Sequence, residues 1–532
     1  MNSVKIILSN VRLLFLLFLF SFPIQAAPAK FLPGLPAPPV AKTARDIRNS
    51  RITALEGKIA RAKVFSAYDE LIGIYREKGL FDAAARLERE QSALYRAKKL
   101  ENAAIIHADR AAALENQLQL FVDTQTTAKS AGKLYTGAAL EPILGCYLGA
   151  FIDRDDSLGE KFVSSTWQSH RTPQQFLAVA GRNPGSLFMY VKYGQPFPKQ
   201  WVELLKAAGT IPHIAWEPTD LNAVRDDEYL NNFAKAAREA DWPIFFRFAS
   251  EMNGFWTPYH GNPKLYREKF RLVNRVLHRH APRAATIWCV NNPPLGNAHE
   301  YYPGDDGCDW VGVNMYSVPF HENRRDKPAF DETPLALLDP IYQKYSARKP
   351  IAICEFAASH QSSVDNKLVP DFAIAKLSQL YGALPLRYPR VKMINWFNMN
   401  TIRYPTPGKS RNNYLLTENP RVLAAWREVT NSPHFLTQLE RLGDVLPPIA
   451  RPLGGQKLRG KVRFQVWAKT FLPKAQLFVA LDGKIVYRAQ KGGAHSFDVD
   501  LSPLKKGKHV LTAYLYDSTK RFQRLTNASF SS

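Results

Sequence analysis

Residues 243–251 read PIFFRFASE, a short apolar run that ends in a polar side chain and a carboxylate. Similar runs recur along the chain, separated by longer stretches in which apolar residues have helical spacing. Short apolar strands that alternate with helices are typical of βαβ units and a parallel sheet. The other runs are residues 144–152, 186–194, 211–218, 286–292, 310–317, 350–357 and 392–398.

Eight runs of this kind within residues 135–436 predict a (β/α)8 barrel with some loop insertions. A doubly wound open sheet is the alternative fold. Sheets of that kind often carry a glycine-rich dinucleotide-binding turn after a strand, and no such turn is present here. We therefore favour the barrel.

The segments on either side of the predicted barrel have different compositions. Residues 44–125 begin with a long proline-free stretch of helical periodicity that resembles a single tetratricopeptide-type hairpin, which we interpret as a structural spacer rather than a binding module. Residues 455–532 contain Asp482-Gly483, a two-residue hairpin signal, and short strand-like runs at 461–469, 475–481, 485–489, 495–501 and 509–517. This pattern predicts a small immunoglobulin-like β-sandwich.

The N-terminal residues predict export. Lys5 and Arg12 precede an apolar run over residues 13–20, and small residues follow at Ala26 and Ala27. This order is typical of a cleaved signal peptide, here residues 1–27, and the run is shorter than the ~20 residues of a spanning helix. A proline-rich linker follows at residues 28–43. We expect a periplasmic or secreted protein with no stable membrane anchor after cleavage.

The chain is strongly basic, with a formal net charge of +24. Residues 451–532 hold 16 Lys and Arg against 4 Asp and Glu, a net of +12, so half of the excess lies in the last segment. A basic balance indicates polyanionic partners. Because export argues against nucleic acid, we expect contact between residues 455–532 and an anionic polymer or cell surface, although a solubilising surface would have the same composition.

The cysteines and the absence of known motifs indicate whether the protein uses disulfides, metals or cofactors. Cys146 and Cys354 fall within apolar runs and are expected to be buried free thiols, while Cys289 and Cys308 are the only pair close enough in sequence to suggest a disulfide. No metal-ligand spacing, phosphate-binding loop or nucleotide fingerprint is present. We therefore expect neither a metal nor a cofactor.

Functional residues of a (β/α)8 barrel lie at the carboxyl ends of its strands. Hydrolysis of a glycosidic bond needs one carboxylic acid to protonate the leaving oxygen and a second carboxylate to attack or stabilise the anomeric centre. Aromatic rings provide platforms for sugars. The predicted strand ends supply both kinds of group, in Glu217, Glu251, Asn291, Tyr316, Glu355 and Trp396.

The segment RFASEMNGFWTPY, residues 247–259, resembles the acid/base region of glycoside hydrolase family 26, the β-mannanase family of retaining (β/α)8 glycosidases. Other segments resemble the family in the same order along the chain. They are IAWEP (214–218), WVGVNMYS (310–317), KPIAICEFA (349–357) and INWFN (394–398).

The resemblance implies roles for these residues. Glu251 would be the general acid/base and Glu355 the nucleophile, with Tyr316 hydrogen-bonded to Glu355. Trp256 and Trp396 would frame the sugar at the cleaved bond. Retention of configuration implies carboxyl groups about 5–5.5 Å apart, and it requires Glu251 to have a raised pKa so that it stays protonated.

Arg247 lies two strand alternations before Glu251, so we expect it to point into the barrel below the site and to keep Glu355 ionised. Ser250 stands where the family usually has histidine, which makes mannan specificity uncertain. Substrates could be a mannan, a β-glucan or an exopolysaccharide. The alternative functions are a polysaccharide-binding protein with a silent barrel and a cell-envelope assembly factor.

Overall fold

The computed structural model describes residues 50–125, 131–164, 169–405, 409, 411–440, 445–472 and 474–532. The predicted signal peptide and linker lie outside the described residues. Within them, no helix is both long and apolar enough to cross a membrane.

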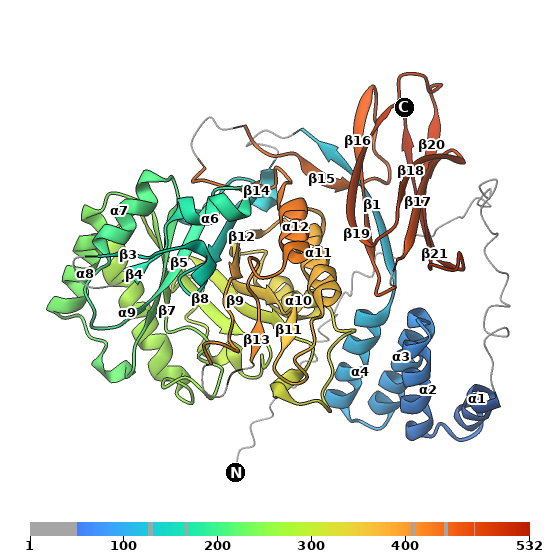
Figure 1. The fold of residues 1–532 in the computed structure, drawn as a ribbon, viewed down its shortest axis with the longest axis horizontal. Coiled ribbons are helices and arrows are strands. Elements are labelled where there is room, and N and C mark those ends of the chain that lie inside the picture. The colour runs from blue at the N-terminus through green and yellow to red at the C-terminus, as the bar shows by residue number, and fades with distance from the viewer. Residues whose placement is uncertain are drawn as a thin grey trace, which may run out of the picture.

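The middle part of the chain forms a closed barrel of eight parallel strands, all of them among the described residues (Figure 1). Each strand overlaps one of the eight apolar runs, and β12 pairs with β2 to close the barrel. The barrel prediction is thereby confirmed. In sheet order the strands are β2 (Cys146–Phe151), β5 (Ser186–Lys192), β6 (Ile211–Glu217), β7 (Ile244–Phe248), β8 (Ala284–Asn291), β9 (Trp310–Ser317), β10 (Ile351–Ala358) and β12 (Val391–Phe397).

Helices surround the barrel, and several start with a proline that follows a capping side chain. Thr172 forms a capping box with Gln175, and Asn262, Thr333 and Asn419 accept hydrogen bonds from the first turns of their helices. The short helix η4 (Ala298–Tyr301) lies between β8 and β9. The longer helices are α6 (Pro173–Ala180), α7 (Lys199–Ala207), α8 (Glu228–Glu239), α9 (Pro263–His280), α10 (Pro334–Tyr345), α11 (Pro370–Arg387) and α12 (Pro420–Thr430).

Side chains alternate between the barrel interior and the layer under the helices. Tyr147, Phe245 and Met393 belong to the interior cluster, whereas Trp288 and Trp396 belong to the larger cluster beneath the helices. β2 has a glycine at position 149 because no larger residue fits there: a Cβ at Gly149 would lie 1.9 Å from Asn395 Oδ1. The four cysteines are buried and free, so Cys289 and Cys308 form no disulfide.

The N-terminal described residues are helical, as predicted, up to Leu114. Residues 117–124 differ from the prediction and form strand β1 (Gln117–Thr124). The reason is the period-two pattern of QLQLFVDT, in which Leu118, Leu120 and Val122 are buried on one face. The four helices are α1 (Ser50–Ala62), α2 (Phe65–Glu77), α3 (Phe81–Ala97) and α4 (Glu101–Leu114).

The C-terminal part is a β-sandwich of two four-stranded antiparallel sheets. The expected hairpin at Asp482 and Gly483 is present, with positive φ at both residues. β1, β15 and β21 were not predicted as strands, and β1 comes from before the barrel. One sheet has the order β15 (Ile449–Pro452), β1, β16 (Lys461–Lys469) and β19 (Gly493–Asp500), and the other has β18 (Lys484–Ala489), β17 (Gln476–Leu481), β20 (Lys508–Tyr516) and β21 (Phe522–Ser531).

The helices and the sandwich form one hydrophobic core. Lys469 Nζ on β16 donates to the carbonyl oxygens of Ala112 and Ala113 at the end of α4, at 2.6 and 2.7 Å. The sandwich also packs on the barrel, where the guanidinium of Arg387 lies 4.8 Å from the ring centroid of Trp467. Figure 1 shows the helices and the sandwich on the same side of the barrel. The carboxyl ends of the barrel strands carry the candidate site.

Candidate active site

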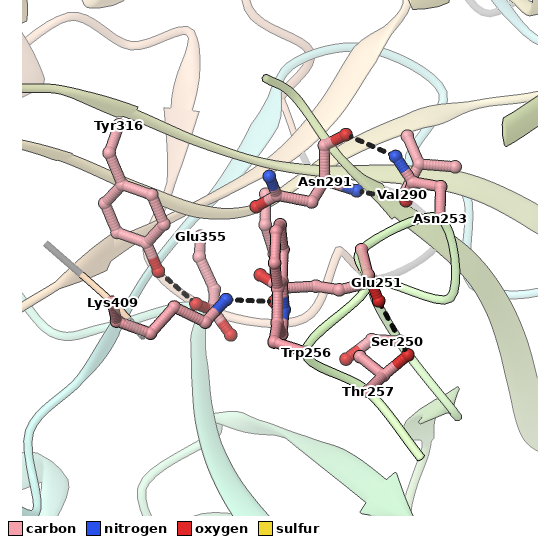
Figure 2. A network of polar contacts seen from close by, with 12 residues as sticks. Ser250, Glu251, Asn253, Trp256, Thr257, Val290, Asn291, Tyr316, Glu355 and Lys409 are labelled. Atoms are coloured by element: carbon pink, nitrogen blue, oxygen red, sulfur yellow. Dashed lines mark hydrogen bonds and ion pairs between the residues drawn. The ribbon is translucent and has the colours of Figure 1, made fainter. Parts of the chain in front are cut away.

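Glu355 lies on β10 and is 3 % exposed. Arg247, fully buried on β7, pairs with its Oε1 at 2.6 Å, so the predicted contact between these two residues is present. Tyr190 on β5 donates to Oε1 at 2.6 Å, and Tyr316 on β9 donates to Oε2 (Figure 2). An ionised carboxylate that accepts from a guanidinium and two hydroxyls is held firmly in one orientation.

The partners of Glu355 keep the protons that they donate to it. Burial opposes the charge of Arg247, but Glu355 and Tyr190 raise the pKa of Arg247 well above its usual value. The Tyr190 residue is 44 % exposed, but loss of water around its hydroxyl, followed by the neighbouring Glu355, raises its pKa well above the usual value. Burial and Glu355 raise the pKa of Tyr316 in the same way. Both tyrosines therefore remain hydroxyl donors over the working pH range.

Glu251 lies in the sharp turn that follows β7. Its φ is +59°, and that of Ala249 is +46°, in a region that non-glycine residues rarely occupy. Such strain is concentrated at functional sites, where the surrounding structure holds it in place. Here the Glu251 amide donates to the Cys289 carbonyl oxygen at 2.9 Å, which ties the turn to the neighbouring strand.

The motif around Glu251 has a physical explanation. Trp256 Nε1 donates to Glu251 Oε2 at 2.7 Å. A Cβ at Gly254 would lie 2.3 Å from the Trp256 ring, so the indole can reach the carboxylate only across a glycine. Asn253 Nδ2 donates to the carbonyl oxygens of Asn291 and Pro294, at 2.8 and 2.6 Å, and joins this turn to the loop after β8.

Two further groups bind Glu251. Asn314 Nδ2 donates to Oε1 at 2.9 Å, and Lys409 Nζ lies 2.6 Å from Oε2 (Figure 2). Arg247 Nη1 donates to Asn314 Oδ1 at 3.0 Å. The two glutamates are therefore connected through Arg247 and Asn314.

The protonation of Glu251 differs from the prediction. Burial alone raises the pKa of its carboxyl, but the Lys409 ammonium and the hydrogen bonds from Lys409, Asn314 and Trp256 outweigh burial, so the pKa lies below its usual value. The expected raised pKa is therefore wrong for this arrangement of side chains. The cause is Lys409, which the sequence did not associate with the site.

A raised pKa is found instead at Glu217, where β6 ends. Burial raises the pKa of this carboxyl, against the charge of Arg247 and the hydrogen bonds from Ser250 and Tyr259. Ser250 Oγ donates to Oε1 at 2.6 Å, and the Tyr259 hydroxyl lies 2.5 Å from Oε2. Ser250 is thus engaged with Glu217.

Trp396 corrects a second prediction. Its side chain is fully buried beneath the helices, and its Nε1 donates to the Tyr414 carbonyl oxygen at 2.9 Å. It therefore does not frame the sugar. Adjacent strand residues point to opposite faces, so Phe397 lies in the position expected for Trp396, with its ring centroid 5.5 Å from that of Tyr316.

Asn291 and three unpredicted residues complete the site. The Asn291 side chain donates to the Pro293 carbonyl oxygen at 2.5 Å within its own turn, and contact with a sugar stays a prediction. Tyr190, Asn314 and Lys409 were missed. Asn314 had a signal, because it lies two residues before Tyr316 on the same strand face. Among the described residues no cluster of potential metal ligands is found.

A closed (β/α)8 barrel with glutamates at the carboxyl ends of its fourth and seventh strands has the arrangement that glycoside hydrolysis requires. Residues 218–331, which include Glu251, match the model of glycosyl hydrolase family 26.

Comparison with solved structures finds proteins of low sequence identity. A modular endo-β-1,4-mannanase from Cellulomonas fimi is 15 % identical, with a TM-score of 0.41 over 77 % of this chain and 99 % of that chain. A family 26 β-mannanase from Bacteroides ovatus is also 15 % identical, with a TM-score of 0.38 over 60 % and 99 %. No curated protein sequence matches the chain.

Proposed function

We propose that the protein is an exported endo-acting glycoside hydrolase that cleaves β-glycosidic bonds of a polysaccharide with retention of configuration. The observation that supports this best is the pair of oriented glutamates. Glu355 is bound by Arg247 and two tyrosines, and Glu251 is bound by Trp256 within the family match.

In the first step, a Glu355 carboxylate oxygen attacks the anomeric carbon while protonated Glu251 gives its proton to the glycosidic oxygen. The carbon–oxygen bond breaks, the leaving chain departs as an alcohol, and a glycosyl ester forms on Glu355. In the second step, Glu251 takes a proton from water, and the resulting oxygen attacks the same carbon and releases Glu355. Tyr190, Tyr316 and Arg247 keep the nucleophile oriented, and Trp256 offers a face for a sugar ring.

The other parts of the proposal rest on sequence pattern. The basic start, apolar run and small residues of the first 27 residues support export to the periplasm or beyond. The basic sandwich, which we propose to be immunoglobulin-like, is suited to an anionic polymer or cell surface. Mannan, β-glucan and exopolysaccharide remain the candidate substrates.

The experiment compares the mature chain with Glu355→Gln for release of reducing sugar from mannans, β-glucans, xylans and acidic polysaccharides. Glu239→Gln, on the exposed surface of α8, is the matched control. We expect activity in the native protein and the control, and a loss of about 10³-fold or more in Glu355→Gln. The anomer released first, followed by proton NMR, tests retention.

A silent barrel predicts a different result. Native protein and Glu355→Gln would then bind the same polymer equally and release no sugar. Activity that survives Glu355→Gln would contradict the assignment of the nucleophile.

A further inference from the structure

Lys409 places a positive charge at the centre of the candidate site. Its Nζ lies 2.6 Å from Glu251 Oε2 and 3.8 Å from the ring centroid of Trp256 (Figure 2). One third of its side chain is exposed, compared with 12 % of that of Glu251. The ammonium therefore covers both the proposed acid and the proposed sugar platform.

Glu251 cannot act as an acid in this arrangement. Its Oε1 accepts from Asn314, and its Oε2 accepts from both Trp256 and Lys409. A carboxylate that accepts these three hydrogen bonds is stabilised in its ionised form. Lys409 has to leave Oε2 before Glu251 can take up a proton and give it to a glycosidic oxygen.

Lys409 also has to move before a substrate can enter. A sugar ring stacked on Trp256 would occupy the space that Lys409 Nζ now fills. The other carboxylates of the site already have partners among the described residues, since Glu355 pairs with Arg247, and Glu217 is bound by Ser250 and Tyr259. An anionic group on the entering sugar would provide the displaced ammonium with a new partner.

The Asn323 side chain binds the backbone of Lys409 and of Arg411. Asn323 Nδ2 donates to the Lys409 carbonyl oxygen at 3.2 Å, and Asn323 Oδ1 accepts from the Arg411 amide at 2.7 Å. The Arg325 guanidinium donates to the Val364 carbonyl oxygen at 3.3 Å, away from Glu251. Lys409 is therefore the cation of this loop that the structure places against the candidate acid.

We propose that Lys409 is a specificity-determining residue that selects a polysaccharide with a carboxylate on the sugar next to the cleaved bond, that is, a uronic acid polymer. The substrate carboxylate replaces Glu251 as the partner of Lys409. This inference rests on the proposed glycosidase function and names its substrate class. It also gives a reason why the enzyme would spare neutral polymers.

The proton balance follows from this exchange. When the ammonium moves to the substrate carboxylate, Glu251 loses its strongest positive neighbour and takes one proton from water. It then passes that proton to the glycosidic oxygen as Glu355 attacks. Lys409 remains charged throughout and transfers no proton.

The test uses a matched pair of substrates with the same backbone. β-1,4-Mannan and β-glucan are each compared with their C6-carboxylated forms, using the full mature chain, Lys409→Met and the surface control Lys235→Met on α8. We expect native protein and control to prefer a carboxylated form by roughly tenfold or more in kcat/KM, the factor that about 1.4 kcal/mol provides. In Lys409→Met the preference should fall to near one.

A binding measurement separates this inference from the glycosidase proposal. Calorimetry with Glu355→Gln, alone and combined with Lys409→Met, records affinity for carboxylated and neutral oligosaccharides without turnover. A preference for the carboxylated ligand that disappears with Lys409→Met would support the inference even if no polymer is cleaved. Equal affinities, or a preference that survives in Lys409→Met, would show that Lys409 simply moves into solvent, and would overturn it.

Discussion

At the residue scale, the protonation of Glu251 depends on one neighbouring ammonium. Lys409 is the strongest of the groups that lower the pKa of this carboxyl, and burial acts in the opposite direction. The acid form required for the first step is lost as the pH rises through this lowered pKa. The free enzyme should therefore have its high-pH limb of kcat/KM shifted towards acid pH.

Replacement of Lys409 by methionine should move that limb to higher pH. The change removes the ammonium but keeps the length of the side chain, so burial then dominates and the pKa of Glu251 rises. A neutral oligosaccharide, whose leaving group departs only with a proton, is assayed for kcat/KM across the pH range and provides the measurement. An unchanged profile, with Lys235→Met as reference, would contradict the assigned role of Lys409.

Sequence reasoning placed Glu251, Glu355 and Arg247 at one end of the barrel from the positions of the strand ends, and their catalytic roles stay predictions. Sequence reasoning failed for Trp396, where a shift of one residue along the strand decides which side chain faces the site. Trp396 and Phe397 are adjacent aromatic residues, and only the alternation of β12 determines that Phe397 faces the site. Lys409 had no local signal, because its position depends on the distant side chain of Asn323.

At the scale of elements, closure of the barrel depends on close contact between β2 and β12. Gly149 pairs with Asn395, and a Cβ at this glycine would lie 1.9 Å from Asn395 Oδ1 and 2.6 Å from the Ser186 carbonyl oxygen. The second atom belongs to the backbone of β5, which cannot move without disturbing the sheet. β2 and β5 would therefore have to separate, and the Asn395 side chain would have to move, to admit one methyl group.

Gly149→Ala should consequently lower the free energy of unfolding by about 1–3 kcal/mol, the usual cost of overpacking a core. Gly73→Ala should instead raise the free energy of unfolding by up to about 1 kcal/mol. Gly73 lies within α2, where an added Cβ meets nothing within 4 Å. Chemical denaturation of both variants makes the comparison. Similar stability of the two would argue against tight closure at this point.

The sequence predicts the elements that are continuous apolar runs or long helical stretches, but it predicts neither β21 nor β1. The barrel strands are continuous apolar runs because both of their faces are buried. β21 carries Gln523, Arg524 and Asn527 among few large apolar residues, and only its pairing with β20 makes it a strand. β1 follows α4 after two residues and was interpreted as part of the helical segment.

At the scale of the whole molecule, the sandwich is not contained in the C-terminal residues. β1 lies between β15 and β16 and pairs with both, and its apolar side chains belong to the core shared with α1–α4. The C-terminal segment alone therefore lacks an internal strand of one sheet and the helices that cover it.

Residues 445–532 expressed alone should show no cooperative thermal unfolding, whereas the same residues joined by a flexible linker to residues 50–125 should unfold cooperatively. Removal of β1 exposes the buried edges of β15 and β16. Circular dichroism during heating, with amide NMR dispersion, makes the comparison. A well-dispersed spectrum from the isolated segment would contradict this dependence.

The position of β1 also affects the order in which the protein is built. Between the end of β1 and the start of β16 the ribosome adds roughly 340 residues, which at ~5–20 residues per second takes roughly 17–70 s. Throughout that time an apolar strand has neither of its partners, while the whole barrel is synthesised. We therefore expect newly made chains to depend on chaperones at this stage, and to be lost to aggregation whenever translation stops within the barrel.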